Sequence, residues 1–403
     1  MTEIIDRYLN QLNNCLKSSS SGRGSEAADI CSDLRAYCIE NITDTQIAYC
    51  SSLLFNPDDG IINFAKAVVL VDEFAKCKEI ILSFLGEYIT KVKTRISPYA
   101  TDIKDICLKL FSTDKNSRVK NETFQVLLQL LELKFDSTIV EKLNVENIVE
   151  KYFSACCQPT KHQSTVKCGI YSLLGTLAEF FPEFMATRAD RLVQIYVGVL
   201  KAEMKKSSKP DMPVIAGCLR GLGSTLVNFT QAVDEGSQYA KDIYTFVRRA
   251  IDTSVEYSRY EVPRAGLNFL ARHSPQYKEY LTRDYEVVYE TLVSWCKRTN
   301  KETRSNAFAA LEAFLKQVAE CLVSRESEVT VQDQEIFKYF IKAFQKIINS
   351  SESVTRDISI AIRGYGYFAK ACKLFLKDDD IKTMFTTMMH MSEQMYFNDS
   401  ELK

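Results

Sequence analysis

The sequence has little of the two residues that most often force a chain to turn. Glycine and proline together account for 22 of 403 residues, less than half of the roughly 12% of average usage. Apolar residues make up 46% of the chain, so a large core can be buried. Few forced turns and many apolar residues favour an all-helical fold over short strands joined by tight turns.

The sequence also lacks an excess of charge and any long hydrophobic run. Its 51 basic and 52 acidic residues leave a net charge of −1, so an electrostatic function must come from local asymmetry. No apolar run approaches the ~18 residues of a membrane span. The first ten residues contain Glu3 and Asp6, unlike a signal peptide. We therefore expect a nuclear or cytosolic protein without a membrane partner.

Thirteen cysteines are present, an odd number without a regular framework. Many lie within apolar helical runs, which favours buried free thiols in a reducing compartment over disulfides. The densest group is Cys156, Cys157, His162 and Cys168. It lacks the paired C-x(2–4)-C spacing of structural zinc sites, so we expect no metal site here.

Apolar residues recur with helical spacing throughout the chain. Phe124, Leu127, Leu128 and Leu131 form one stripe at i, i+3, i+4 and i+7, and similar stripes follow. Pairing adjacent helices gives units that begin near residues 99, 145, 188, 239, 284 and 334. Their spacing of 43 to 51 residues is close to the ~40–47 of HEAT-type repeats. The sequence therefore predicts an all-α fold, an α-solenoid of HEAT-like antiparallel helix pairs.

We expect two regions of different character. Residues 1–54 are predicted to form divergent N-terminal helices with a Ser/Gly-rich loop at 17–25. Residues 55–403 are predicted to form the HEAT-like repeats. The methionine-rich residues 382–397 do not resemble a polar closing cap. We therefore expect further repeats beyond residue 403.

One segment fits two different structures. Ile358, Ile360 and Ile362 alternate like a strand, and Gly364, Gly366 and Ala369 then follow the G-x-G-x-x-A spacing of a dinucleotide-binding turn. Such a turn needs a βαβ context, and the neighbouring segments are helical instead. We favour glycines that let two helices approach closely. Gly217, Gly221 and Gly223 are interpreted in the same way.

No catalytic signature is present. The sequence contains no G-x-x-x-x-G-K-[ST] phosphate loop, no H-R-D or D-F-G kinase motif and no G-x-S-x-G nucleophile turn. We therefore assign no catalytic residue, metal ligand or cofactor to this chain.

Basic residues gather in three places that lie near predicted helix ends. Residues 91–120 contain eight bases and three acids, a local charge of +5. Such runs often form solvated faces, but in a solenoid successive turns share one edge, where bases can form a track for phosphates. Aromatic residues do not alternate with these bases, which favours contact with a duplex backbone over single-strand stacking. The candidate nucleic-acid-binding residues are Lys91, Lys93, Arg95, Lys115, Arg118, Lys120, Lys201, Lys205, Lys206, Lys209, Lys297, Arg298, Lys301 and Arg304.

Several long strings resemble the N-terminal region of the DNA-dependent protein kinase catalytic subunit family. They are P-V-I-A-G-C-L-R-G-L at residues 213–222, N-F-T at 228–230, R-Y-E-V-P-R-A-G-L at 259–267, A-L-E-A-F-L-K-Q-V at 310–318 and S-I-A-I-R-G-Y-G at 359–366. Weaker matches are I-S-P-Y at 96–99 and I-K-D-I-C at 103–107. The matches occur in the family's order and cover roughly residues 55–397, whereas the first 50 residues match poorly.

This resemblance implies more than the composition does. The family comprises giant nuclear serine/threonine kinases of the phosphatidylinositol-3-kinase-related group. Their N-terminal helical-repeat arm cradles double-stranded DNA ends and meets the Ku heterodimer in non-homologous end joining, a pathway of double-strand break repair. The resemblance implies that the kinase domain, with its ATP and Mg²⁺, lies in another part of the full-length protein. That remainder of the full-length protein is then also a partner of this region.

Two other functions stay open at this point. One is a HEAT-type adaptor that binds protein segments without nucleic acid. The other is a nucleotide-dependent enzyme built on residues 364–369.

Overall fold

The computed structural model describes residues 2–379 except 134–136, 159–160, 207–208, 234–237, 256–259, 326–328 and 349–354, together with isolated positions between 381 and 389. Every regular element in these ranges is a helix, which confirms the all-α prediction. Most of the methionine-rich residues 382–397 lie outside the described residues. No described helix is both long and apolar enough to cross a membrane.

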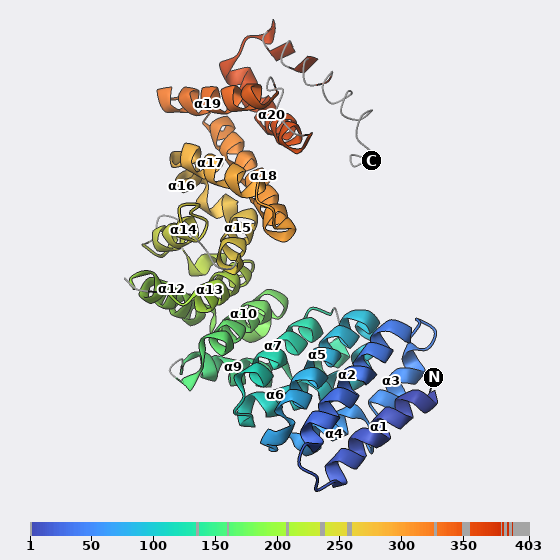
Figure 1. The fold of residues 1–403 in the computed structure, drawn as a ribbon. Coiled ribbons are helices and arrows are strands. Elements are labelled where there is room, and N and C mark those ends of the chain that lie inside the picture. The colour runs from blue at the N-terminus through green and yellow to red at the C-terminus, as the bar shows by residue number, and fades with distance from the viewer. Residues whose placement is uncertain are drawn as a thin grey trace. The chain divides into compact units, whose positions relative to one another are not determined.

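The helices are arranged in pairs, each with a first and a second helix (Figure 1). The first helices are α1 (Thr2–Lys17), α3 (Ile47–Leu54) with α4 (Ile61–Val68), α6 (Ala100–Thr113), α9 (Val145–Cys156), α12 (Ala189–Met204), α14 (Gln238–Ala250), α17 (Tyr285–Cys296) and α19 (Val331–Ile348). The second helices are α2 (Arg23–Asn41), α5 (Ala75–Val92), α7 (Ser117–Leu131), α10 (Ser164–Phe180), α13 (Met212–Thr225), α15 (Glu261–His273), α18 (Lys301–Ser324) and α20 (Thr355–Phe375).

From α6 onward, each first helix begins within three residues of its predicted start. Shorter elements complete the chain. They are the helices α8 (Ser137–Leu143), α11 (Pro182–Met185) and α16 (Lys278–Arg283), and the 3₁₀ helices η1 (Asp72–Phe74), η2 (Lys93–Tyr99), η4 (Thr230–Ala232) and η5 (Ser274–Tyr277). The HEAT-like helix pairs predicted from the spacing of apolar stripes are therefore confirmed.

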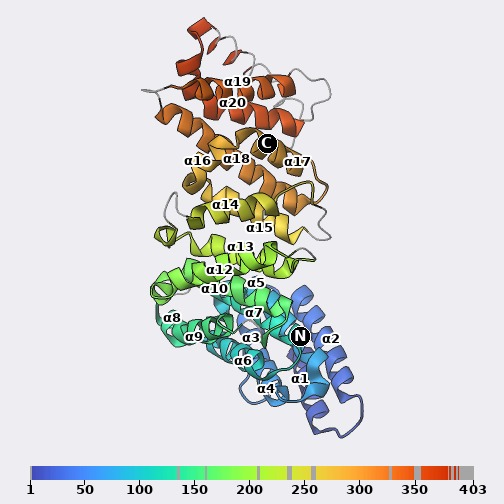
Figure 2. The same cartoon turned by 90° about the vertical axis from the view of Figure 1, so that its left-hand side faces the viewer.

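The chain divides into two compact units, Met1–Ala232 and Val233–Lys403. In the first unit the second helices α2, α5, α7, α10 and α13 pack consecutively against one another. In the second unit α15, α18 and α20 do the same (Figures 1 and 2). The turn between α1 and α2 spans residues 18–22, inside the predicted loop. A separate region 1–54 stays a prediction, although α2 packs directly against α5.

Close backbone approach between α10 and α13 depends on glycine. A Cβ atom on Gly217 would lie 2.7 Å from the Cα atom of Cys168, and one on Gly175 would meet the backbone of Gly221. At either position the added Cβ atom would lie closer to its neighbour than real Cβ contacts allow. The structure thus confirms the predicted close packing at the Gly217 and Gly221 positions.

The segment with dinucleotide-like spacing lies in α20, and its isoleucines belong to that helix. Gly364 faces the buried ring of Phe344 from α19, as predicted for a packing glycine. Gly366 is exposed and has nothing within 4 Å of a Cβ position. The packing prediction was therefore wrong for Gly366, because this residue lies on the outer side of the same helix.

A buried ion pair joins neighbouring repeats in the first unit. Lys78 of α5 pairs with Asp114, which follows α6, and also donates to the carbonyl oxygen of Val69 at 3.2 Å. The two charged side chains are 1% and 2% exposed. Such a pair is costly to break, because removing either partner leaves a buried charge without compensation.

Candidate nucleic-acid interface

Antiparallel pairing gives each unit two edges where the turns gather. We call the turns within a pair the intra-repeat edge and the links between pairs the inter-repeat edge. In the first unit the described residues of the intra-repeat edge are 18–22, 69–74, 114–116, 157–158, 161–163, 205–206 and 209–211. The two edges are separated by the length of a helix, about 21 Å for the 14 residues of α6.

Contacts between successive turns show that the intra-repeat edge of the first unit is continuous. The ammonium group of Lys115 lies 3.3 Å from the carboxylate of Asp72 in the preceding turn. The Phe111 ring stacks on the imidazole of His162 in the following turn, with centroids 5.9 Å apart. The next two turns are joined because Ser164 donates a hydrogen bond to Asp211.

Seven of the predicted candidates lie along this edge. They are Lys115, Arg118, Lys120, Lys201, Lys205, Lys206 and Lys209. Lys206 is held by both carboxylate oxygens of Glu203, at 2.6 and 2.7 Å. Arg118, Lys205 and Lys209 are exposed, and no described acidic group forms an ion pair with them. These three side chains can therefore meet an external anion without first losing an internal partner.

The other three candidates of the first basic run lie on the opposite edge. Lys91 donates to the carbonyl oxygens of Cys38 and Ile39, at 3.2 and 2.5 Å, and so satisfies the end of α2. Arg95 donates to the carbonyl oxygen of Asp44 at 3.0 Å. Lys93 is exposed next to them. The run that looks continuous in sequence is thus divided between two edges, because α6 carries the chain from one to the other.

The third run lies on the turn between α17 and α18 in the second unit. The guanidinium of Arg298 lies 5.3 Å from the centre of the Trp295 ring. Arg304 donates to the carbonyl oxygen of Arg298 at 3.2 Å, which helps to close the turn. Lys297 and Lys301 are exposed. Two of the four candidates therefore also have local structural contacts.

The structure adds a cluster that the sequence analysis did not assign. Lys161 and Lys167 lie close enough to His162 to act on its charge, together with Lys120 from the neighbouring turn. Burial, followed by the positive charges of these lysines, lowers the pKa of His162. The ammonium group of Lys120 also lies 5.7 Å from the centre of the Phe111 ring. Only the prediction that successive turns share an edge could have indicated this grouping.

The cysteines lie mostly within the helical core. None of the thirteen forms a disulfide with another described residue, and eleven are buried, whereas Cys157 is exposed and Cys168 is half-buried. Within the described ranges, no three His, Cys, Asp or Glu side chains are placed to hold a metal ion together. Burial raises the pKa of the Cys156 thiol to about 12, which keeps this group protonated at neutral pH.

Comparison with known proteins places the chain among relatives of far greater length. The DNA-dependent protein kinase catalytic subunit of Xenopus laevis is 35% identical over 389 residues, which are 96% of this chain and 9% of that protein. The same protein of Canis lupus familiaris is 34% identical over 360 residues, with shares of 89% and 9%. This chain thus spans about a tenth of the length of these relatives.

A solved structure of Kap95p bound to RanGDP has a similar fold, with a TM-score of 0.54 at 11% identity. The match covers 97% of this chain and 50% of that one, and it supports the α-solenoid architecture alone. The family model described as "DNA-PKcs, N-terminal" matches residues 48–403, which confirms the resemblance found in the sequence strings. Since this match covers most of the chain, the protein belongs to the DNA-PKcs N-terminal family.

Proposed function

We propose that this chain is the N-terminal helical-repeat arm of a nuclear DNA-repair serine/threonine kinase. In this role it cradles double-stranded DNA ends and docks the Ku heterodimer during non-homologous end joining. Family membership supports the assignment to such a kinase. The observation that supports DNA binding is the continuous intra-repeat edge of the first unit, with its exposed bases Arg118, Lys205 and Lys209.

Contact with the duplex backbone fits the chemistry of this edge. The available groups are ammonium and guanidinium ions, which bind phosphate oxygens whatever the base sequence. The cluster of Lys120, Lys161, His162 and Lys167 adds positive charge near the middle of the edge. Binding of this kind releases counterions, so its affinity falls steeply as salt concentration rises.

Catalysis belongs elsewhere in this proposal. The kinase domain, with its ATP and Mg²⁺, would lie in another part of the full-length protein. This arm would position the DNA end and would not take part in phosphoryl transfer. The Ku heterodimer would then bring the DNA end and the arm together. An adaptor that binds only protein segments is the alternative that the tests must exclude.

The test compares charge reversals on the two edges. One variant of the 403-residue chain carries Arg118→Glu, Lys205→Glu and Lys209→Glu on the intra-repeat edge. Its control carries two reversals, Lys93→Glu and Arg95→Glu, on the inter-repeat edge. Binding of a blunt-ended fluorescent duplex is followed by anisotropy across a salt series, with and without Ku.

We expect the intra-repeat variant to bind more weakly and to reduce the slope of log affinity against log salt by about one for each lost phosphate contact. The control variant should keep the slope of the unmodified chain. Equal affinities for all three proteins, or binding that does not respond to salt, would exclude the proposed interface and favour the adaptor.

A further inference from the structure

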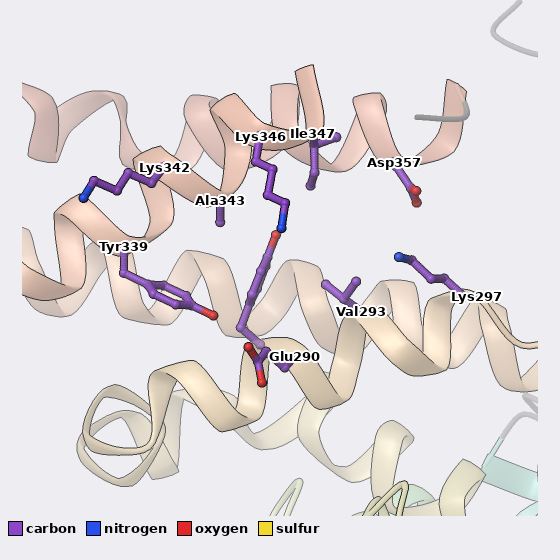
Figure 3. A pocket seen from close by; sticks show the side chains of 10 residues that line it. Glu290, Val293, Lys297, Tyr339, Lys342, Ala343, Lys346, Ile347 and Asp357 are labelled. Atoms are coloured by element: carbon purple, nitrogen blue, oxygen red, sulfur yellow. The ribbon is translucent and has the colours of Figure 1, made fainter. Parts of the chain in front are cut away.

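A cavity of about 490 Å³ opens between the first helices α17 and α19 of the second unit, next to the start of α20. Figure 3 shows that its walls are two helix faces. The α17 side presents positions 289 and 293 of the helix and position 297, which caps its end, and the α19 face presents positions 339, 343 and 347. Each set is spaced by four residues, so each forms one stripe along its helix. The α19 stripe is about 12 Å long, which matches two turns of a bound helix.

The floor of this α17–α19 groove is apolar and aromatic. Val293, Ala343 and Ile347 line it and are all partly exposed. The rings of Tyr289 and Tyr339 meet edge to face across it, with centroids 6.0 Å apart and planes at 88°. A partly exposed floor of this kind gains free energy when an apolar side chain covers it.

One buried polar group in the groove has no partner among the described residues. The Tyr289 side chain belongs to a residue that is only 6% exposed, and its hydroxyl forms no hydrogen bond with any of them. Buried hydroxyls in folded proteins are nearly always bonded, so the free chain carries a penalty that an external acceptor would remove after the side chains covering this hydroxyl move aside. Burial also raises the pKa of Tyr289, which keeps the hydroxyl protonated and able to donate.

Three lysines around the groove can receive an external anion. Lys297, Lys342 and Lys346 line it, and none of the three forms an ion pair with a described residue. In Figure 3 the ammonium groups of Lys297 and Lys346 point into the space between the helices, whereas Lys342 extends away along α19. Glu290 and Asp357 also line the groove, so three cations and two carboxylates surround it.

We propose that this groove binds a short amphipathic helical segment of a protein partner, with an acidic side chain at Lys297 and Lys346 and an apolar side chain on the floor. The carboxylate would accept hydrogen bonds from the two ammonium groups, and from the Tyr289 hydroxyl once the side chains that cover this hydroxyl move aside. An apolar anchor at i and i+4 of the partner would cover Val293 and Ile347. This is the helix-in-groove mode of recognition, and it does not depend on DNA binding by the first unit.

A nucleic acid fits this groove less well. Glu290 and Asp357 would repel a continuous row of phosphates, and a duplex backbone has no apolar group to cover the floor. A peptide carries both kinds of side chain and can also place its own donors near the two carboxylates. The experiment must therefore distinguish binding of duplex DNA at this groove from binding of the proposed peptide.

The probe is a fluorescein-labelled helical peptide of roughly 15 residues, with leucine at i, i+3, i+4 and i+7 and glutamate alternating with glutamine at the other positions, so that amide donors can face Glu290 and Asp357. Two control peptides replace every glutamate by lysine or every leucine by serine. Anisotropy with the 403-residue chain should show saturable binding of the first peptide alone. Absence of saturable binding, or equal binding of the lysine peptide, would overturn the proposal.

Variants then locate the site. Lys297→Glu with Lys346→Glu should weaken binding roughly tenfold, whereas Lys338→Glu, an exposed position of α19 outside the groove, should leave it unchanged. Tyr289→Phe should weaken binding severalfold and leave the thermal midpoint of the free chain unchanged or higher, because it removes an unsatisfied hydroxyl.

Three results would contradict the assignment. They are a double variant that binds like the unmodified chain, a Lys338→Glu variant that binds as weakly as the double variant, and displacement of the peptide by a DNA duplex whose own binding is lost in the double variant. The last result would identify the groove as part of a nucleic-acid surface. Because none of these variants alters the first unit, failure here leaves the proposed DNA interface untouched.

Discussion

Gly221→Ala in α13 is the substitution that most directly tests how the repeats are held together. A Cβ atom at this position would lie 2.6 Å from the Tyr196 hydroxyl oxygen and would also press on the carbonyl oxygen of Tyr171 in α10. Carbon and oxygen atoms need about 3.3 Å or more. The backbones of α10 and α13 must therefore separate by most of an ångström.

The magnitude follows from three contributions. Overpacking of a tight core costs roughly 1–3 kcal/mol. The hydrogen bond from the Tyr196 hydroxyl to the Tyr171 carbonyl, 2.8 Å long and buried, lies at the same point, and losing it costs about 1–3 kcal/mol more. Alanine offsets about 1 kcal/mol through its higher helix propensity. We expect the free energy of unfolding to fall by about 1–5 kcal/mol.

The assay is equilibrium urea unfolding followed by far-ultraviolet circular dichroism, with Gly198→Ala as the matched control. Gly198 lies within α12, and nothing lies within 4 Å of its Cβ position. The control should therefore stabilise the chain by up to about 1 kcal/mol. Gly221→Ala that matches or exceeds the stability of the unmodified chain, or Gly198→Ala that is equally damaging, would refute close packing of α10 and α13 at this position.

Three further changes give outcomes of known sign. Asp114→Asn leaves the Lys78 ammonium buried without its counter-charge and should cost about 3–5 kcal/mol in urea unfolding; an unchanged midpoint would contradict this. Gly364→Ala should lower the thermal midpoint because its Cβ meets a buried phenylalanine ring, whereas Gly366→Ala should raise it; the reverse order would refute the packing scheme. The lowered pKa of His162 means that the unfolded chain binds more protons than the folded one below about pH 6.5. Stability should therefore fall as pH decreases through this range, and His162→Gln should reduce the slope of midpoint against pH.

The repeat architecture could be predicted from sequence because each helix carries a local signal. The buried stripe of Phe124, Leu127 and Leu131 has helical spacing, and polar turns separate successive stripes. Close helix packing at Gly217 and Gly221 could also be predicted, since small residues four apart on an apolar helix indicate close approach. The exposed position of Gly366 could not be predicted in this way, because spacing alone does not show which side of α20 packs against a neighbour.

The candidate sites were less predictable because they depend on which turns meet. Arg95 and Lys115 are 20 positions apart in sequence and belong to one basic run, yet they lie on opposite edges. Lys120 and Lys161, although farther apart in sequence, both act on His162. The groove likewise combines side chains from residue 289 to residue 357. None of these groupings has a period or a motif that a linear sequence can show.

The proposed binding surfaces lie apart from the contacts that stabilise the stacked helix pairs. The contacts that hold neighbouring pairs together lie mainly between second helices, where glycines allow backbones such as those of α10 and α13 to touch. The exposed bases lie at turns, and the groove lies between two first helices. Substitutions at Arg118 or Lys346 change no buried contact, since both residues are exposed. A charge reversal there that also unfolds the chain would mean that these side chains stabilise the fold, and the separation of packing from binding would then be wrong.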